Sequence, residues 1–417
     1  MSSVRAHAPE RRVVGLIRVL LGFESVIYSA VIPLLPHYAH EFAASKPAVG
    51  VLAAAYPAGM LPGALLGGWI ATRAGVRRTT VVGLLLFTAA IAPFGFGSSI
   101  AALDALRFIQ GVACGCIWSG GLAWVIAVAP RARRGEVLGS VLASAIFGTL
   151  VGPMLGTLAV AIGPEIVFAC VGAVSLGLTA WTLEFHEPPR TSLGGAAPLR
   201  ALVSNRRFMF GFWLVVLIAC TIGATNVLLP LRLSRFGASG VEIGVTFVFA
   251  SLVSALLSPW VGREVDRRGI VMPLAVGLTG SALLFALLPL PDSALALAIL
   301  TVLALGGPLV GAEMGAVTVM TDAVERVGAA LAFGTMLLNV AWATGETVGA
   351  PAAATLSRAT SDAVPLVLLA AAMLLTAVPV LLARRRRGGA QRAVTAEGGS
   401  APSRARAAGA RSAPGAM

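Results

Sequence analysis

Long apolar stretches alternate with short polar segments along most of this 417-residue chain. Each stretch holds about 20 residues with few charges, the length that an α-helix needs to cross a hydrocarbon core of ~30 Å. The alternating segments of a membrane barrel are missing. The pattern predicts an all-α integral membrane protein with twelve transmembrane helices, at residues 13–36, 48–71, 79–97, 100–128, 136–160, 164–184, 208–231, 241–261, 271–290, 293–321, 328–356 and 362–383.

Three short patterns recur between the first and second halves of the chain at a nearly constant offset. The pairs are Ile32-Pro33-Leu34 with Leu229-Pro230-Leu231, Gly68-x3-Thr72-Arg73-x-Gly75 with Gly262-x3-Asp266-Arg267-x-Gly269, and Gly148-x3-Gly152-Pro153 with Gly345-x3-Gly349-Ala350-Pro351. Membrane transporters are commonly built from such repeats, with the substrate site between them. We therefore expect an N-tail at 1–12, a six-helix half at 13–185, a linker at 186–207, a second six-helix half at 208–384 and a disordered basic tail at 385–417.

The formal charge of +13 is typical of a nucleic-acid binder, but the distribution of the basic residues argues against that partner. Most Lys and Arg lie in the tails and in the segments that one side of the membrane would hold, as the positive-inside rule requires. The exceptions are Lys46, Arg232, Arg235 and Arg358 on the other side, and Arg18 and Arg107 within spans. We expect a cell inner membrane protein with both termini and the linker in the cytoplasm.

A glycine- and arginine-rich segment follows the second predicted span, at Gly68-Trp69-Ile70-Ala71-Thr72-Arg73-Ala74-Gly75-Val76-Arg77-Arg78. It resembles the G-x-x-x-D-R-x-G-R-R signature of the major facilitator superfamily, and the resemblance extends over residues 13 to 384. It implies the major facilitator fold, in which this loop latches the two halves together. Thr72 and Val76 depart from the signature. The alternative, a basic anchoring loop, explains the arginines but not the glycine spacing. The latch residues are Gly68, Thr72, Arg73, Gly75, Arg77, Gly262, Asp266, Arg267 and Gly269.

The fifth predicted span carries Gly148-Thr149-Leu150-Val151-Gly152-Pro153-Met154-Leu155-Gly156-Thr157. This stretch is similar to G-x-x-x-G-P-x-x-G-G, the antiporter motif of the twelve-helix drug:proton antiporter family. The resemblance assigns motif roles to Gly148, Gly152, Pro153 and Gly156 and implies export in exchange for protons. The alternative is close packing of small residues between helices, which membrane bundles commonly use.

Charged and amide side chains inside the spans are candidate functional residues, because ionisable groups are costly in hydrocarbon. Arg107, in Leu103-x3-Arg107-x-x-Gln110-Gly111, resembles a second motif of the superfamily; its alternative role is an ion pair with Asp104 on the same helix. Glu24, nine residues before Pro33, resembles the Asp of the vesicular amine transporter-like subgroup, although Asn339 replaces another Asp of that group. We expect proton or substrate coupling by Glu24, Arg107 and Glu313, and a cavity lined by Asn226, Asn339 and Glu346. Asn226 could equally cap or kink its helix before Pro230.

These features predict a proton-coupled exporter of small amphipathic compounds, cations among them, that works by alternating access. Two alternatives stay open: uptake of a small metabolite by symport or facilitated diffusion, and a non-transporting membrane receptor. The sequence contains no nucleophile with a base, no metal cluster and no phosphate loop, so an enzyme is not expected. The cysteines lack metal-ligand spacing, and we expect no cofactor. The expected partners are protons, a small molecule and the lipid bilayer, with the chain as a monomer.

Overall fold

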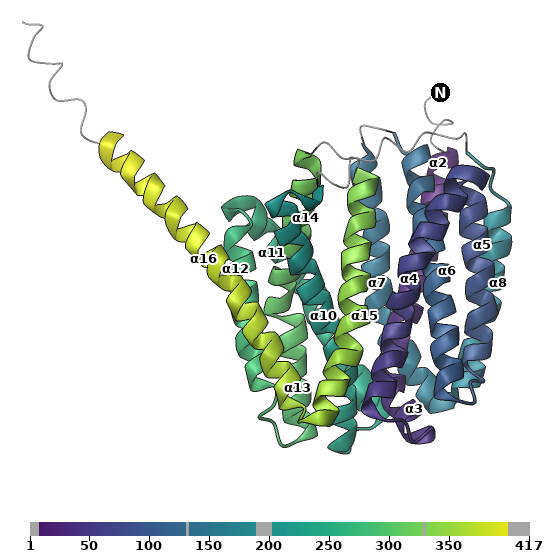
Figure 1. Ribbon diagram of the computed structural model, residues 1–417. Helices are drawn as coiled ribbons and strands as arrows, with labels where there is room; N and C mark the ends of the chain where they lie inside the picture. Colours follow the sequence, from purple (N-terminus) through teal and green to yellow (C-terminus); the bar gives the residue numbers. More distant parts are fainter. Residues whose placement is uncertain (1–7, 131–132, 189–201, 328–330, 399–417) are drawn as a thin grey trace, which may run out of the picture.

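The computed structural model describes residues 8–130, 133–188, 202–327 and 331–398. The secondary structure of these residues is helical throughout, and the helices lie side by side in one bundle (Figure 1). The helices are α2 (Ala8–Ala30), η1 (Ile32–Leu34), α3 (Leu35–Glu41), α4 (Lys46–Ala74), α5 (Val76–Phe94), α6 (Ile100–Val128), α7 (Arg134–Ile162), α8 (Pro164–Leu183), α10 (Arg206–Arg235), α11 (Gly240–Arg268), α12 (Val271–Leu287), α13 (Ala294–Gly306), α14 (Pro308–Arg326), α15 (Leu331–Ala359) and α16 (Ala363–Gly398). The end of the bundle where α2 begins is the terminal face, and the other end is the opposite face.

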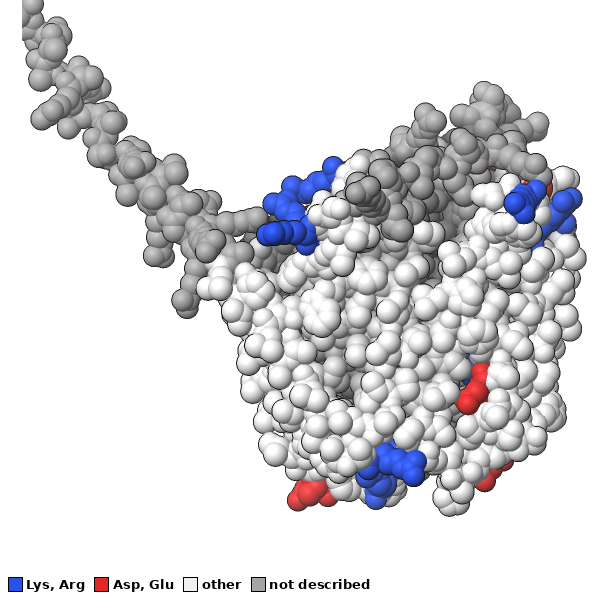
Figure 2. All heavy atoms as spheres, viewed as in Figure 1, with Lys and Arg blue, Asp and Glu red and all other residues white. Residues whose placement is uncertain are grey.

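The predicted spans match these helices closely. Within the described residues, ten helical segments are long and apolar enough to cross a membrane, and α12 is a shorter apolar helix. With α15 they make the twelve expected spans. Figure 2 shows charged side chains mainly at the two ends of the bundle, with few in the belt between them. Large apolar side chains such as Leu65, Leu256 and Leu375 are exposed there, as a lipid-facing surface requires.

Three spans differ in detail from the expectation. The first is broken at Pro33, which has no N–H to donate, and continues through η1 and α3 to Glu41 rather than ending at 36. The tenth, expected to be continuous over 293–321, is interrupted at Gly307, just before Pro308. The last helix continues to Gly398, into the segment expected to be disordered, because Ala, Arg and Gln are good helix formers. Residues 399–417 and most of the expected linker lie outside the described residues.

Buried apolar side chains form two separate cores. The first is built mainly from α2 to α8, which we call the N-half, and includes Phe87, Phe94 and Trp124. The second is built mainly from α10 to α16, which we call the C-half, and includes Leu278 and Phe285. In Figure 1 the N-half lies on the right and the C-half on the left. Each half therefore packs chiefly on itself.

The repeated glycines lie at corresponding helix contacts in the two halves. On α7, a Cβ at Gly148, Gly152 or Gly156 would overlap backbone or side-chain atoms of α2. On α15, a Cβ at Gly345 or Gly349 would likewise overlap the backbone of α10. Only glycine permits so close an approach of two helices. The glycines of the fifth span thus allow close helix packing, and the same kind of contact recurs in the C-half.

This packing predicts a destabilised Gly152→Ala variant. The added methyl group would overlap the Ser29 hydroxyl and the Val26 carbonyl, and overpacking of this kind costs about 1–3 kcal/mol. Gly139→Ala on the same helix is the matched control, because a Cβ there meets nothing within 4 Å. Thermal unfolding in detergent should show a Tm several degrees lower for Gly152→Ala and an unchanged or higher Tm for Gly139→Ala. Equal melting temperatures would contradict the packing.

Candidate functional site

Glu24 lies in the interior of the N-half, on the face of α2 that packs against α6. The residue is 3% exposed, and its Oε2 accepts a hydrogen bond of 2.8 Å from the Trp118 indole. Its Oε1 is buried and has no hydrogen-bond partner among the described residues. A buried acceptor without a donor costs free energy unless a ligand or proton occupies it. Glu24 therefore has the environment expected of a group that binds something.

Arg107 lies beside this carboxylate, on α6. Its guanidinium donates to Gln110 Oε1 at 3.0 Å and to the Tyr28 carbonyl at 3.2 Å, and its Cζ lies 4.4 Å from the centre of the Tyr56 ring. A hydrogen-bonded guanidinium over an aromatic face is a stable way to bury this charge. The alternative ion pair with Asp104 is not formed: Asp104 is only half-buried, and its Oδ1 has no partner in the described part of the chain. Asp104 and Arg107 lie about one turn apart on α6, and the Arg107 side chain points into the bundle.

Glu346 joins the cluster from the C-half. It lies on α15, is 4% exposed, and its Oε1 accepts a hydrogen bond from the Tyr28 hydroxyl of α2. Gly223 of α10 allows α15 to pack closely against α10 at this point, because a Cβ at Gly223 would lie 3.0 Å from the Glu346 carbonyl oxygen. The sequence analysis predicted that Glu346 lines a cavity, and it did not identify Tyr28 as a functional residue. The signal for Tyr28 was its position four residues after Glu24, on the same helix face.

A small cavity of about 30 Å³ lies between the two halves at this cluster. Polar side chains from four helices line it, and the apolar lining comes from Val31, which precedes η1, and from η1, α3, α4, α10 and α15. The polar lining residues are Tyr28, Arg107, Asn226 and Glu346. Asn226 thus lines the cavity. Glu313 on α14 and Asn339 on α15 are half-buried and are not among the residues that line it.

The loop after α4 contacts its own half. Gly75 ends α4 with φ +105°, and the carboxylate of Glu187 accepts hydrogen bonds from the backbone N–H groups of Arg77, at 3.1 Å, and Arg78, at 3.4 Å. The Arg77 guanidinium donates to the Leu183 carbonyl at 3.1 Å. These contacts tie the start of α5 to the end of α8. They do not join the two halves.

The remaining residues of the expected latch are described in part. Thr72 Oγ1 donates to the Trp69 carbonyl at 2.9 Å, and Arg73 lies over the Trp69 ring at 4.5 Å. Gly68 lies within α4 and Gly262 within α11, whereas Gly269 ends α11 with φ +76°. Arg267 is exposed, and the side chain of Asp266 lies outside the described residues. The latch between the halves stays a prediction.

An ion cluster joins the two halves at the opposite face. Lys46, the first residue of α4, contacts Asp362 Oδ1 at 2.5 Å, and Arg235 at the end of α10 contacts Asp362 Oδ2 at 2.7 Å. Ser357 donates to the same carboxylate and accepts from Lys46 at 2.8 Å. Burial raises the pKa of Asp362, but hydrogen bonds from Lys46 and Ser357 and the charges of Arg235 and Lys46 outweigh it, so the pKa lies below its usual value. Asp362 is therefore ionised and holds a cation from each half.

Close packing between the halves is found next to this cluster. A Cβ at Gly50 of α4 would overlap Pro351 and Ala354 of α15, and Gly240 and Gly244 of α11 meet α7 in the same way. Towards the terminal face, α4 and α15 diverge (Figure 1). The bundle is thus closed at the opposite face, with the central cavity directly inside the closure.

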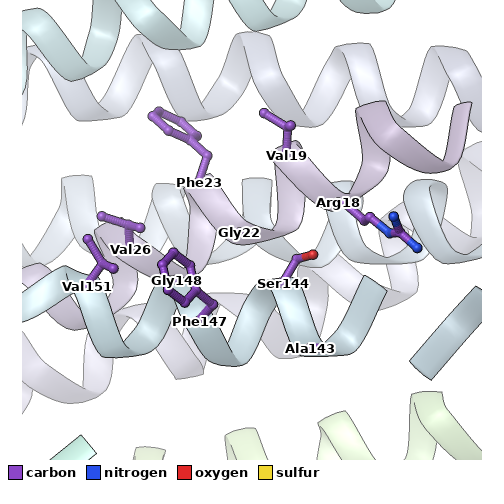
Figure 3. Close-up of a pocket in the computed structure, with 10 residues that line it drawn as sticks. All are labelled: Arg18, Val19, Gly22, Phe23, Val26, Ala143, Ser144, Phe147, Gly148 and Val151. Carbon is purple, nitrogen blue, oxygen red and sulfur yellow. The ribbon is translucent and has the colours of Figure 1, made fainter. Parts of the chain in front are cut away.

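A second, larger hollow of about 530 Å³ lies between α2 and α7 (Figure 3). Its lining is largely apolar, and its charged group is Arg18, which donates to the Ser140 hydroxyl through Nε and Nη2. Figure 3 shows Arg18 at one end of the hollow and Phe23 and Val26 further along α2. Arg18 is exposed and bound to Ser140, so it does not belong to the central cluster.

Comparison with known proteins agrees with this architecture. A model described as Major Facilitator Superfamily matches residues 19–346, well over half of the chain. Similar curated proteins include the uncharacterized MFS-type transporter C18.02 of Schizosaccharomyces pombe, 22% identical over 297 residues, and the uncharacterized MFS-type transporter YcaD of Escherichia coli, 25% identical over 260 residues. Each alignment covers 62% of this chain, and the chain spans about two thirds of these relatives, 66% and 67% of their lengths.

Two solved structures share the fold. One is a bacterial homolog of the human lysosomal transporter Spinster in an inward-facing and unoccupied conformation, with a TM-score of 0.71, 14% identity and coverage of 89% of this chain and 95% of that one. The other is the nucleoside transporter NupG, with a TM-score of 0.70, 13% identity and coverage of 89% and 98%. These two likenesses show that the chain shares their fold of two helical halves. This chain belongs to the major facilitator superfamily, so it is a secondary transporter and not an enzyme.

Proposed function

We propose that this transporter exports small amphipathic compounds, organic cations among them, in exchange for protons. The observation that carries the proposal is the buried carboxylate of Glu24, whose Oε1 has no hydrogen-bond partner among the described residues and which lies beside Arg107, a residue that lines the central cavity. A carboxylate in such a site can hold either a proton or a cationic group, but not both. Competition for one carboxylate couples the two fluxes.

The proposed orientation places the terminal face in the cytoplasm. The basic residues of the tails and of the α4–α5 turn support it, since positive charge is retained on the cytoplasmic side. Closure at the opposite face then corresponds to an inward-facing state. The transporter would load its substrate from the cytoplasm, close around it, and open outward when the contacts of Asp362 and Glu346 are released. Pro153 on α7, next to the packed glycines, supports export in particular through the antiporter motif.

The test is flux in liposomes that contain only this protein. Tetraphenylphosphonium, a monovalent lipophilic cation, would be loaded inside vesicles whose protein is oriented with the terminal face inward, and an inward proton gradient imposed. We expect cation exit together with internal acidification reported by a pH-sensitive dye. Movement of cation and protons in the same direction would instead establish symport. The absence of any gradient-driven flux of this cation would refute the proposed function.

A further inference from the structure

We propose that Tyr28 and Glu346 form a substrate-sensitive contact between the halves, which holds the opposite face closed until an organic cation takes the Tyr28 hydroxyl's place on the Glu346 carboxylate. This inference rests on the proposed function and deepens it. It assigns a positioning role to Tyr28, and it makes Glu346 a second binding carboxylate, on the half opposite Glu24. The substrate class it names is a monovalent organic cation.

The position of the contact supports this role. The Tyr28 hydroxyl reaches across the boundary from α2 to α15, and both residues line the cavity itself. Glu346 lies one to two turns before Pro351, where α15 packs closely against Gly50 of α4. The hydrogen bond is therefore the innermost of the contacts described at the closed face. A ligand that enters from the terminal face meets it before any other part of the closure.

The charges around Glu346 favour a cation as the competitor. Several elements present groups to this carboxyl: Tyr28 from α2, Arg107 from α6, Asn226 from α10, Glu313 from α14 and Trp342 on α15 itself. With Glu24 and Glu346 ionised, the single guanidinium of Arg107 leaves the cluster at least one positive charge short, and Glu313 increases that deficit. Arg107 is already committed to Gln110 and the Tyr28 carbonyl. One cationic group completes the balance, and a charged donor binds a carboxylate more strongly than a phenol does.

Two substitutions separate the contact from the charge. Tyr28→Phe removes the hydroxyl but keeps the ring beside Tyr56 and the carbonyl that Arg107 uses, so the closure should weaken without any ligand. Glu346→Gln keeps an oxygen that accepts from Tyr28 but removes the charge, so the closure should persist and resist the cation. Tyr38→Phe is the matched control, because the Tyr38 hydroxyl of α3 is buried and has no hydrogen-bond partner among the described residues.

The readout is the distance between spin labels at His40 and Leu290, exposed residues of the N-half and the C-half near the opposite face. Labels would be attached to cysteines introduced there, after serine replaces the four native cysteines. Without ligand, Tyr28→Phe should raise the population of the longer distance several-fold, and Tyr38→Phe should match the parent chain. An unchanged distribution for Tyr28→Phe would overturn the contact, whether or not the chain couples protons to flux.

The second measurement adds tetraphenylphosphonium at increasing concentration. The parent chain should shift towards the longer distance, and Glu346→Gln should need at least a tenfold higher concentration for the same shift. Tyr28→Phe should respond at a lower concentration than the parent, because the competing hydroxyl is gone. An equal response of the parent and Glu346→Gln, or no response of the parent, would overturn the assignment of the cation to Glu346. Neither outcome depends on a proton gradient, so the inference and the proposed antiport fail separately.

Discussion

Glu24→Gln is expected to abolish proton-coupled flux while leaving the protein folded. Glutamine retains an acceptor for the Trp118 indole, which now binds Oε2 at 2.8 Å, so the contact between α2 and α6 should persist. It cannot take up a proton or pair with a cation, which removes the competition that couples the two fluxes. We expect coupled flux to fall by at least a hundredfold, because glutamine leaves no group at this position that can exchange a proton for a cation.

The measurement follows cation exit and internal pH together in the liposome assay described above. Glu184→Gln, which replaces an exposed carboxylate at the end of α8, is the matched control and should retain coupling. Thermal unfolding of both variants in detergent should lie close to the parent, which separates loss of coupling from loss of fold. Coupled flux that survives in Glu24→Gln would make Glu24 a structural residue and leave Glu346 as the leading carboxylate.

The sequence predicted individual functional residues better than it predicted their partners. Glu24 and Arg107 stand out because a charge inside a 20-residue apolar stretch is costly wherever its helix packs. Which groups compensate that cost depends on helix contacts between residues far apart in the chain. Tyr28 and Glu346 are such a pair, and no local pattern connects them. The ion pair that local spacing offered as an alternative, Asp104 with Arg107, does not form, because Arg107 points into the bundle towards α2 and α4.

The fold was largely predictable for a similar reason. Span positions depend on hydropathy over about 20 residues, which the chain carries clearly, and the repeated glycines indicated matching contacts in the two halves. The ion cluster around Asp362 was not predicted, because its members come from three separate segments and each looks like an ordinary loop charge. The breaks at Pro33 and Gly307 are local effects that a window of that length averages out.

Asp362→Asn is expected to open the opposite face. Asp362 accepts from Lys46 and Arg235, and without its charge these two cations repel each other across the boundary between the halves. Hydrogen bonds to charged groups contribute about 1.5–3 kcal/mol, and the exposure of Arg235 reduces this to roughly 1–2 kcal/mol here. That corresponds to an approximately tenfold larger population of the open state. Spin labels at His40 and Leu290 would report it, with Asp292→Asn, an exposed aspartate before α13, as the control.

The ion cluster around Asp362 is expected to respond to pH differently from the central site. Because contacts in the closed state hold the pKa of Asp362 below its usual value, the stabilisation is complete above about pH 4 and is lost only as the pH falls through that lowered pKa. Between pH 5 and pH 8 the ion cluster should therefore be insensitive to protons. A change of the His40–Leu290 distance in that range that arises from the buried carboxylates should vanish in Glu24→Gln or Glu346→Gln but persist in Asp362→Asn. A pH response that disappears with Asp362 instead would move the proton-sensitive step to the opposite face.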